Sequence, residues 1–171
     1  MGRLRAVLGV VFVQTYIGPE ALLILLWGGL RLDPRRFREA SETPAATHLC
    51  LGVSALAGVA RGFQLANELK LTPAFMAVLG VAIALGGVVF ESGIVVLLAR
   101  VVPSVRAARF GEVLRPLALA AAPAVFYALV PVVPETVPLA LCLSLWLLIA
   151  FVVAIRAALG GGTALAVAVA V

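Results

Sequence analysis

Few side chains in this sequence could do chemistry, and the sharpest candidate is a carboxylate, Glu91, inside the apolar stretch 73–99. A charged group at the centre of a bilayer costs about 2.5–3.5 kcal/mol or more, and such groups often handle protons or ions. His48, the single histidine, lies at a similar depth, and Arg61 lies nearer the opposite side. We expect Glu91 to face the helix 45–66, where it contacts His48 or a backbone donor, or else is protonated.

Three interpretations of Glu91 stay open. It could make a structural polar contact between two helices, it could handle a proton or an ion, or a shifted helix could bring it to the headgroups. The structural contact is the favoured interpretation, because polar residues commonly hold membrane helices together. Arg61, near the end of its helix, can extend its charge toward the membrane surface.

The rest of the polar inventory is too small for most catalysis. The sequence has two cysteines, Cys50 and Cys142, and it has no CxxC motif, Cys/His cluster, P-loop, paired carboxylates or Ser/His/Asp arrangement. We therefore predict no metal, no cofactor and no enzymatic activity. We expect the two cysteines near opposite sides of the membrane, beyond the ~7 Å limit for a disulfide.

Composition assigns the chain to the membrane proteins. Hydrophobic residues make up 64% and charged residues 12%, with a mean hydropathy of +1.18, whereas soluble domains carry roughly 25% charge. A water-soluble fold of 171 residues cannot hide that much apolar surface, so the lipid bilayer must be its solvent. The net charge of +5 comes mostly from arginines beside apolar stretches, which favours lipid headgroups over nucleic acid as partners.

The elements that must position these residues are apolar helices, and the sequence predicts an all-α, polytopic transmembrane bundle. Residues 1–44 form an N-terminal hydrophobic or amphipathic segment with a basic stretch, and residues 45–171 form the transmembrane domain. At ~1.5 Å per residue, four stretches can cross a ~30 Å hydrocarbon layer, and a fifth is too short unless it is a truncated span. The predicted helices are 45–66, 73–99, 114–130, 137–156 and the short 161–171.

Prolines and small residues predict how the helices bend and pack. Pro123 lies inside the third span, so we expect a kink there, because proline removes one backbone hydrogen bond. Small residues on one face of the second span predict close packing against another helix. These residues are Gly80, Ala84, Gly86 and Gly87.

The N-terminal segment does not form a clear span. Residues 6–30 are apolar, but Pro19 and Glu20 fall near their middle, where a missing backbone bond and a carboxylate are both costly. We prefer an interfacial or re-entrant segment in which Pro19 opens a short helix. Whether the segment spans, lies on or re-enters the membrane stays open. Asp33 is predicted to cap a second short helix, whose Phe37 faces the membrane.

The arginines predict both orientation and lipid contacts. The segments 31–44 and 100–115 are rich in arginine, while the connections 67–72 and 131–136 are not. The positive-inside rule therefore places the first two segments in the cytoplasm. The Ala, Val, Leu, Arg and Gly bias indicates a GC-rich prokaryotic genome, and we therefore expect the protein in the cytoplasmic membrane of a prokaryote. The residues predicted to contact headgroups, including those of anionic lipids, are Arg31, Arg35, Arg36, Arg38, Arg100, Arg106, Arg109 and Arg115.

Three stretches of the chain carry a family resemblance. They read RLDPRRFREASETPAATHLCLGV, RFGEVLRPLALAAAPAVF and LWLLIAFVVAIRAALGGGTALAVAVA. The Phe-Gly-Glu step at 110–112, the Ala-Ala-Pro bend at 121–123 and the helix 146–156 before a glycine break carry most of it. Over residues 31–171 the chain resembles the Yip1 family of small polytopic membrane proteins, as a prokaryotic-type member.

The resemblance implies five membrane helices and a cytoplasmic N-terminus, in agreement with the orientation above. Eukaryotic members of the family are implicated in vesicle traffic through contact with small GTPases, and prokaryotic members have no assigned activity. The chain departs from the family pattern in two ways. Its N-terminus is hydrophobic rather than long and polar, and its fifth helix is short.

The leading hypothesis is a non-catalytic integral membrane protein of Yip1-like type. It would serve as a scaffold or bind a membrane or cytosolic protein partner. The first alternative is a small transporter or channel subunit that uses Glu91. The second alternative is an accessory subunit of a membrane enzyme, whose partner supplies the catalytic groups.

Overall fold

The structure is all-helical over the residues that it describes. The computed structural model describes residues 19–101, 108–132 and 136–160, and these contain no strand. Residues 1–18 and the short helix predicted at 161–171 lie outside this part of the chain. By length and composition, four helical stretches are able to cross a membrane, as predicted. They are Pro44–Leu69, Pro73–Val101, Phe110–Val132 and Pro138–Leu159.

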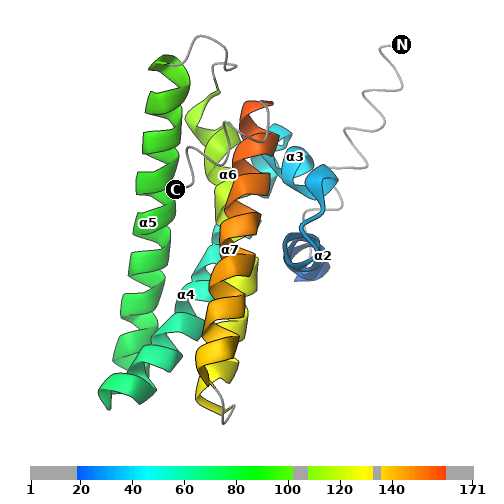
Figure 1. The fold of residues 1–171 in the computed structure, drawn as a ribbon. Coiled ribbons are helices and arrows are strands. Elements are labelled where there is room, and N and C mark those ends of the chain that lie inside the picture. The colour runs from blue at the N-terminus through cyan, green and yellow to red at the C-terminus, as the bar shows by residue number, and fades with distance from the viewer. Residues whose placement is uncertain (1–18, 102–107, 133–135, 161–171) are drawn as a thin grey trace, which may run out of the picture.

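Eight helical elements follow one another along the described residues (Figure 1). They are α2 (Pro19–Leu30), α3 (Pro34–Glu42), η1 (Pro44–Ala46), α4 (Thr47–Leu69), α5 (Pro73–Val101), α6 (Phe110–Ala120), η2 (Ala122–Val132) and α7 (Thr136–Leu159). α4, α5 and α7 correspond to three of the predicted spans, and each ends a few residues later than predicted. The predicted helix 114–130 is divided between α6 and η2.

The third span changes helix type partway along. α6 ends at Ala120 and the chain continues as the 3-10 helix η2, so the kink expected at Pro123 takes the form of this change. Pro123 and Pro131 lack a backbone N–H and cannot donate the hydrogen bonds of a continuous α-helix. As a result η2 packs against both α4 and α7.

α6 begins at Phe110, inside the segment 100–115 that the sequence predicts to be a loop. Arg109 is extended, and its backbone N–H donates to the Glu112 carboxylate at 3.3 Å. This contact satisfies a donor at the N-terminus of the helix and favours an early start. The helix thus begins four residues earlier than the predicted 114–130, and Arg115 lies in its middle.

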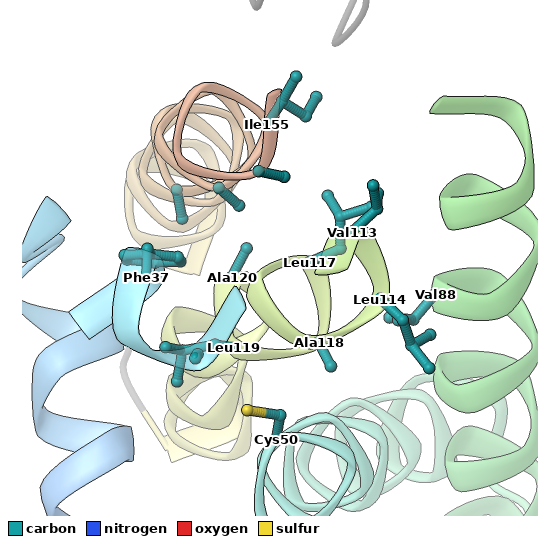
Figure 2. Close-up of a cluster of buried hydrophobic side chains, with 14 of the residues drawn as sticks. Phe37, Cys50, Val88, Val113, Leu114, Leu117, Ala118, Leu119, Ala120 and Ile155 are labelled. Carbon is teal, nitrogen blue, oxygen red and sulfur yellow. The ribbon is translucent and has the colours of Figure 1, made fainter. Parts of the chain in front are cut away.

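α6 is the centre of the hydrophobic core. Every residue in the range 113–120 is buried, and Figure 2 shows side chains of the surrounding helices gathered around it. Phe37, which the sequence predicts at the membrane, is instead 0% exposed and belongs to this core. α3 therefore packs its apolar face on the bundle rather than on lipid. Four neighbours labelled in Figure 2 are Phe37, Cys50, Val88 and Ile155.

α4 and α5 cross in close contact through glycines. A Cβ atom placed on Gly58 would lie 2.6 Å from the carbonyl oxygen of Gly80, and one on Gly62 would overlap the backbone of α5. The predicted packing face of α5 is thus confirmed at Gly80. Gly86 and Gly87 differ, because a Cβ atom on either would meet nothing within 4 Å. This part of α5 is open.

α2 runs across the bundle rather than along it, so Figure 1 views it almost end-on. Its 12 residues reach ~18 Å, which is too short to cross a membrane. α3 lies at the end of the bundle where α6 begins and α7 ends. Asp33 caps α3 as predicted, because its side chain accepts from the Arg35 backbone N–H at 3.0 Å.

Candidate functional site

A groove beside Glu91, here named the Glu91 groove, is the first candidate site. It lies between α5 and α7 over α6 and has a volume of about 330 Å³. Figure 1 shows α5 standing apart from α7 along the bundle. Every other side chain that lines the groove is apolar, as suits a surface within a bilayer. The apolar residues include Ile94, Leu117, Leu148, Phe151 and Ile155.

A second groove adjoins the first. It has a volume of about 370 Å³ and is bounded by α4, α5, η2 and α7. Its polar residues include Ser54, Arg61 and Tyr127, and we name it the Arg61 groove. Glu91 and Phe151 line both grooves, which therefore meet at these two side chains.

Glu91 has no polar partner within the described part of the chain, where no hydrogen bond or ion pair includes its carboxylate. Its side chain is exposed in the groove. Glu91 does not contact His48 as predicted, because His48 is exposed at the start of α4. The reason is geometric. α4 and α5 meet near the connection between them and diverge toward their other ends, and α6 packs against both (Figure 1).

Arg61 lies on the wall of the Arg61 groove, where its guanidinium contacts one aromatic ring and one side-chain amide. Its guanidinium lies 4.2 Å from the ring centroid of Tyr127, and its Nη1 donates to Gln64 Oε1 at 2.6 Å. Gln64 in turn donates to the Glu68 carboxylate at 2.7 Å. Within the described residues no hydrogen bond or ion pair joins Arg61 to Glu91, which agrees with their different predicted depths.

Arg115 does not lie at the surface, where the sequence predicts that it contacts lipid headgroups. Its side chain is buried, with 6% of its area exposed. Its Nε donates to the carbonyl oxygen of Ala40 at 2.8 Å, and its Nη2 donates to that of Ser41. Ser41 Oγ donates in turn to the Glu112 carbonyl at 2.9 Å. The two acceptors of Arg115 lie near the C-terminus of α3, where backbone carbonyls lack partners and a positive charge is favourable. Arg115 thus joins α3 to α6.

The other described arginines that the sequence predicts to contact headgroups lie on or beside α3, at the end of α5 and at the start of α6, which are at one end of the bundle (Figure 1). Their contacts with headgroups stay a prediction. Arg31 lies 4.5 Å from the ring centroid of Trp27, and Arg36 pairs with Glu39 at 2.9 Å. Arg106 lies outside the described residues. The exposed arginines among the remainder are Arg35, Arg38, Arg100 and Arg109.

Sequence reasoning missed two residues of the Arg61 groove. Ser54 is fully buried, and its Oγ has no hydrogen-bond partner among the described residues. Tyr127 contacts Arg61 through its ring and Ser144 through its hydroxyl, at 3.1 Å. A signal exists for Ser54, which lies two helical turns before Arg61 on the same helix face. Tyr127 lies beyond the bend of the third span, and no local pattern predicts its position.

The helices and grooves define an all-helical protein whose four long apolar helices suit an integral membrane protein. Within the described residues, no group of three or more His, Cys, Asp or Glu side chains could hold a metal, and Cys50 and Cys142 are both free. Comparison with protein-family models, with curated proteins and with solved structures finds no match.

Proposed function

We propose that the chain is a non-catalytic integral membrane protein that binds a transmembrane helix of a partner protein in the Glu91 groove. The observation that carries this proposal is the Glu91 carboxylate, which lies in an apolar groove without a polar partner among the described residues. A carboxylate in that setting costs free energy until a cation or a hydrogen-bond donor approaches it. The partner helix supplies that group as a Lys, Arg or other donor side chain.

The surface around Glu91 suits a helix. Ile94 on α5 and Leu148 on α7 are 40% and 41% exposed on the two walls of the groove. Gly87, one helical turn before Glu91, lines the adjoining Arg61 groove, and a Cβ atom on it would meet nothing within 4 Å, so a neighbouring backbone can approach α5 closely there. Membrane helices associate by such close packing and by interhelical polar contacts, which contribute about 1–2 kcal/mol in model peptides.

The groove supports binding better than catalysis. Among the described residues that line it, Glu91 is the only titratable one. General acid–base and nucleophilic mechanisms ordinarily use a second positioned group. A scaffold or partner-binding role needs only shape and one polar contact.

Site-specific photocrosslinking in native membranes tests this proposal. A photoreactive residue at position 94 or 148 should give a discrete crosslinked protein, because both positions face the groove. The matched controls are positions 78 and 141, which lie on the same two helices, are more exposed and do not line the groove. Mass spectrometry of the product should identify an apolar segment with a basic or donor side chain.

Glu91→Leu tests whether the carboxylate is needed. It should reduce the crosslinked product from positions 94 and 148 about tenfold, which corresponds to ~1.4 kcal/mol of binding free energy. Equal crosslinking from groove and control positions would contradict the proposal. Crosslinking that survives Glu91→Leu, or crosslinking to lipid alone, would contradict it as well.

A small transporter or channel subunit is the second candidate function, and the meeting of the two grooves at Glu91 favours it. Together the grooves follow α5 from Gly80 to Val95, ~22 Å along the helix. Ion or proton flux in liposomes, measured for the wild type and for Glu91→Gln, separates the two functions. Flux that Glu91→Gln abolishes supports transport, and a wild type without flux supports partner binding.

We also propose the Yip1-like build and the orientation that the sequence indicates, with 31–44 and 100–115 on the cytoplasmic side of a prokaryotic membrane. The build rests on the sequence resemblance over residues 31–171. The orientation is supported by the exposed Arg35, Arg38, Arg100 and Arg109, which lie on elements at one end of the bundle. Tags inserted at positions 105 and 134 should report opposite compartments. A shared compartment would contradict this orientation.

A further inference from the structure

The Arg61 groove contains a polar group that the proposed function does not use. Ser54 lines this groove and is fully buried, and its Oγ has no hydrogen-bond partner among the described residues. Serines within helices can bond to a carbonyl one turn back, as Ser92 does to Val88 at 2.6 Å. A buried hydroxyl without such a bond is destabilising. Ser54 thus indicates a ligand that supplies a hydrogen-bonding atom.

Arg61 provides a positive charge in the same groove. It gives one hydrogen bond to Gln64 and lies over Tyr127, so most of its five N–H donors stay available. Arg36 and Glu39 form the only ion pair within the described ranges, so no carboxylate there pairs with Arg61. Guanidinium groups bind phosphate and carboxylate well, because their donors match the acceptor oxygens.

Apart from Ser54, the groove between Arg61 and Glu91 is lined mainly by apolar residues. Ile83 and Leu147 line it, and a Cβ atom on Gly87 would meet nothing within 4 Å. Its volume of about 370 Å³ falls within the roughly 300–1,000 Å³ of small-molecule sites. This wall suits a hydrocarbon chain, and Glu91 disfavours an anionic group at the opposite end.

We propose that the Arg61 groove binds one membrane lipid with an acidic headgroup. The lipid phosphate lies at Arg61, an ester oxygen accepts from the Ser54 hydroxyl, and a hydrocarbon chain follows α5 toward Glu91. Ser54 lies ~10 Å from Arg61 along α4, and phosphate, ester and chain follow one another in that order in a phospholipid. This inference goes beyond partner binding, because it concerns a different groove and a different ligand.

Native mass spectrometry of the purified full chain tests the site. The protein is incubated with phosphatidylglycerol or with phosphatidylcholine of the same acyl chains. We expect about fivefold greater retention of the anionic lipid, the factor that one arginine contributes near a lipid phosphate. Inorganic phosphate in excess should not displace the lipid, because it lacks the chain that fills the groove. Equal retention of the two lipids, or displacement by phosphate, would overturn the proposal.

Two adjacent glycines supply matched variants. Gly87 lines the groove and Gly86 does not, and a Cβ atom on either meets open space. Leucine can therefore be introduced at both positions without displacing the backbone. Gly87→Leu should reduce retention of phosphatidylglycerol about fivefold, and Gly86→Leu should leave it unchanged. The same retention in both variants would overturn the proposal.

Arg61→Gln tests the headgroup contact independently of the groove-filling variant. It should make retention of the two lipids equal, because it removes the charge and keeps an uncharged polar side chain. Ser54→Ala should weaken both lipids alike, because both contain ester groups. A preference for phosphatidylglycerol that survives Arg61→Gln would overturn the assignment of the headgroup to Arg61.

Discussion

Two charged side chains in apolar helices, Arg115 and Glu91, have opposite environments. Arg115 is 6% exposed, and two backbone carbonyls of α3 accept its N–H groups. Glu91 is exposed in a groove and has no polar partner in the described part of the chain. The fold satisfies the first charge and uses it to join two helices, whereas it leaves the second without a partner among the described residues. A charge in an apolar helix therefore indicates function where the fold leaves it unpaired.

The helices that carry these charges differ in the same way. Within the most apolar 18 residues of Phe110–Val132, the span that contains Arg115, 72% are buried, against 22% in the corresponding 18 residues of each of Pro73–Val101 and Pro138–Leu159. α6 is thus a core element. α5 and α7 leave most of their surface exposed, and the Glu91 groove lies between them.

The largest expected effect comes from Arg115→Met. It leaves the carbonyls of Ala40 and Ser41 buried without a donor, and hydrogen bonds to a charged group contribute roughly 1.5–3 kcal/mol each. We expect a loss of about 3 kcal/mol in the free energy of unfolding, measured by thermal unfolding in detergent. Arg109→Met, an exposed arginine at the start of the same helix, should change little. Equal stability of the two variants would assign Arg115 to the membrane surface.

Gly62→Val tests whether the crossing of α4 and α5 holds one wall of the groove in place. The added side chain would overlap the backbone of α5, and overpacking of this kind costs about 1–3 kcal/mol. The same thermal measurement should show that loss for Gly62→Val and little change for Gly86→Val, where the side chain enters open space. A tolerated Gly62→Val would mean that the two helices are further apart than described.

Ser41→Ala should have a smaller effect at the Arg115 junction. It removes the hydrogen bond from Ser41 Oγ to the Glu112 carbonyl and leaves the Arg115 contacts with the backbone intact. The expected loss is about 1 kcal/mol in the free energy of unfolding. Glu42→Ala, at the neighbouring exposed position, is the control. A loss as large as that of Arg115→Met would mean that the serine, not the arginine, joins the helices.

The smallest expected effect on stability comes from Glu91→Leu. The substitution removes no contact among the described residues, and it takes a carboxylate away from an apolar surface. The free energy of unfolding should therefore fall by no more than about 0.5 kcal/mol, and an increase is equally consistent with the unpaired carboxylate. Chemical unfolding in mixed micelles measures this change. A loss of several kcal/mol would reveal an internal partner for Glu91 and remove the contrast with Arg115.

The sequence could predict features that depend on neighbouring residues. Long apolar stretches predict the four candidate spans, and Asp33 before Pro34 predicts the cap of α3, because each signal is local. Arg115 could not be predicted in this way. Its acceptors lie 74 and 75 residues away, and an arginine beside others at the end of an apolar stretch resembles a headgroup contact.

The position of Glu91 could be predicted only in part. The rise of a helix places Glu91, nine residues before Arg100, ~13 Å inside, whereas His48, three residues after Ala45, lies only ~5 Å inside by the same arithmetic. The two levels therefore do not match, and no local pattern predicts the angle between α4 and α5, which separates the two side chains further. The bend before Tyr127 likewise brings η2 to the Arg61 groove through packing that no local pattern contains.

Labelling with a hydrophobic carbodiimide, which modifies carboxyl groups within membranes, tests most directly whether Glu91 is open and unpaired. In the purified, folded chain the reagent should modify Glu91, as located by peptide mass spectrometry, and Glu91→Gln should remain unmodified at that position. A Glu91 that stays unmodified in the folded chain and reacts only after unfolding would contradict the account, because the fold itself would then cover the carboxylate.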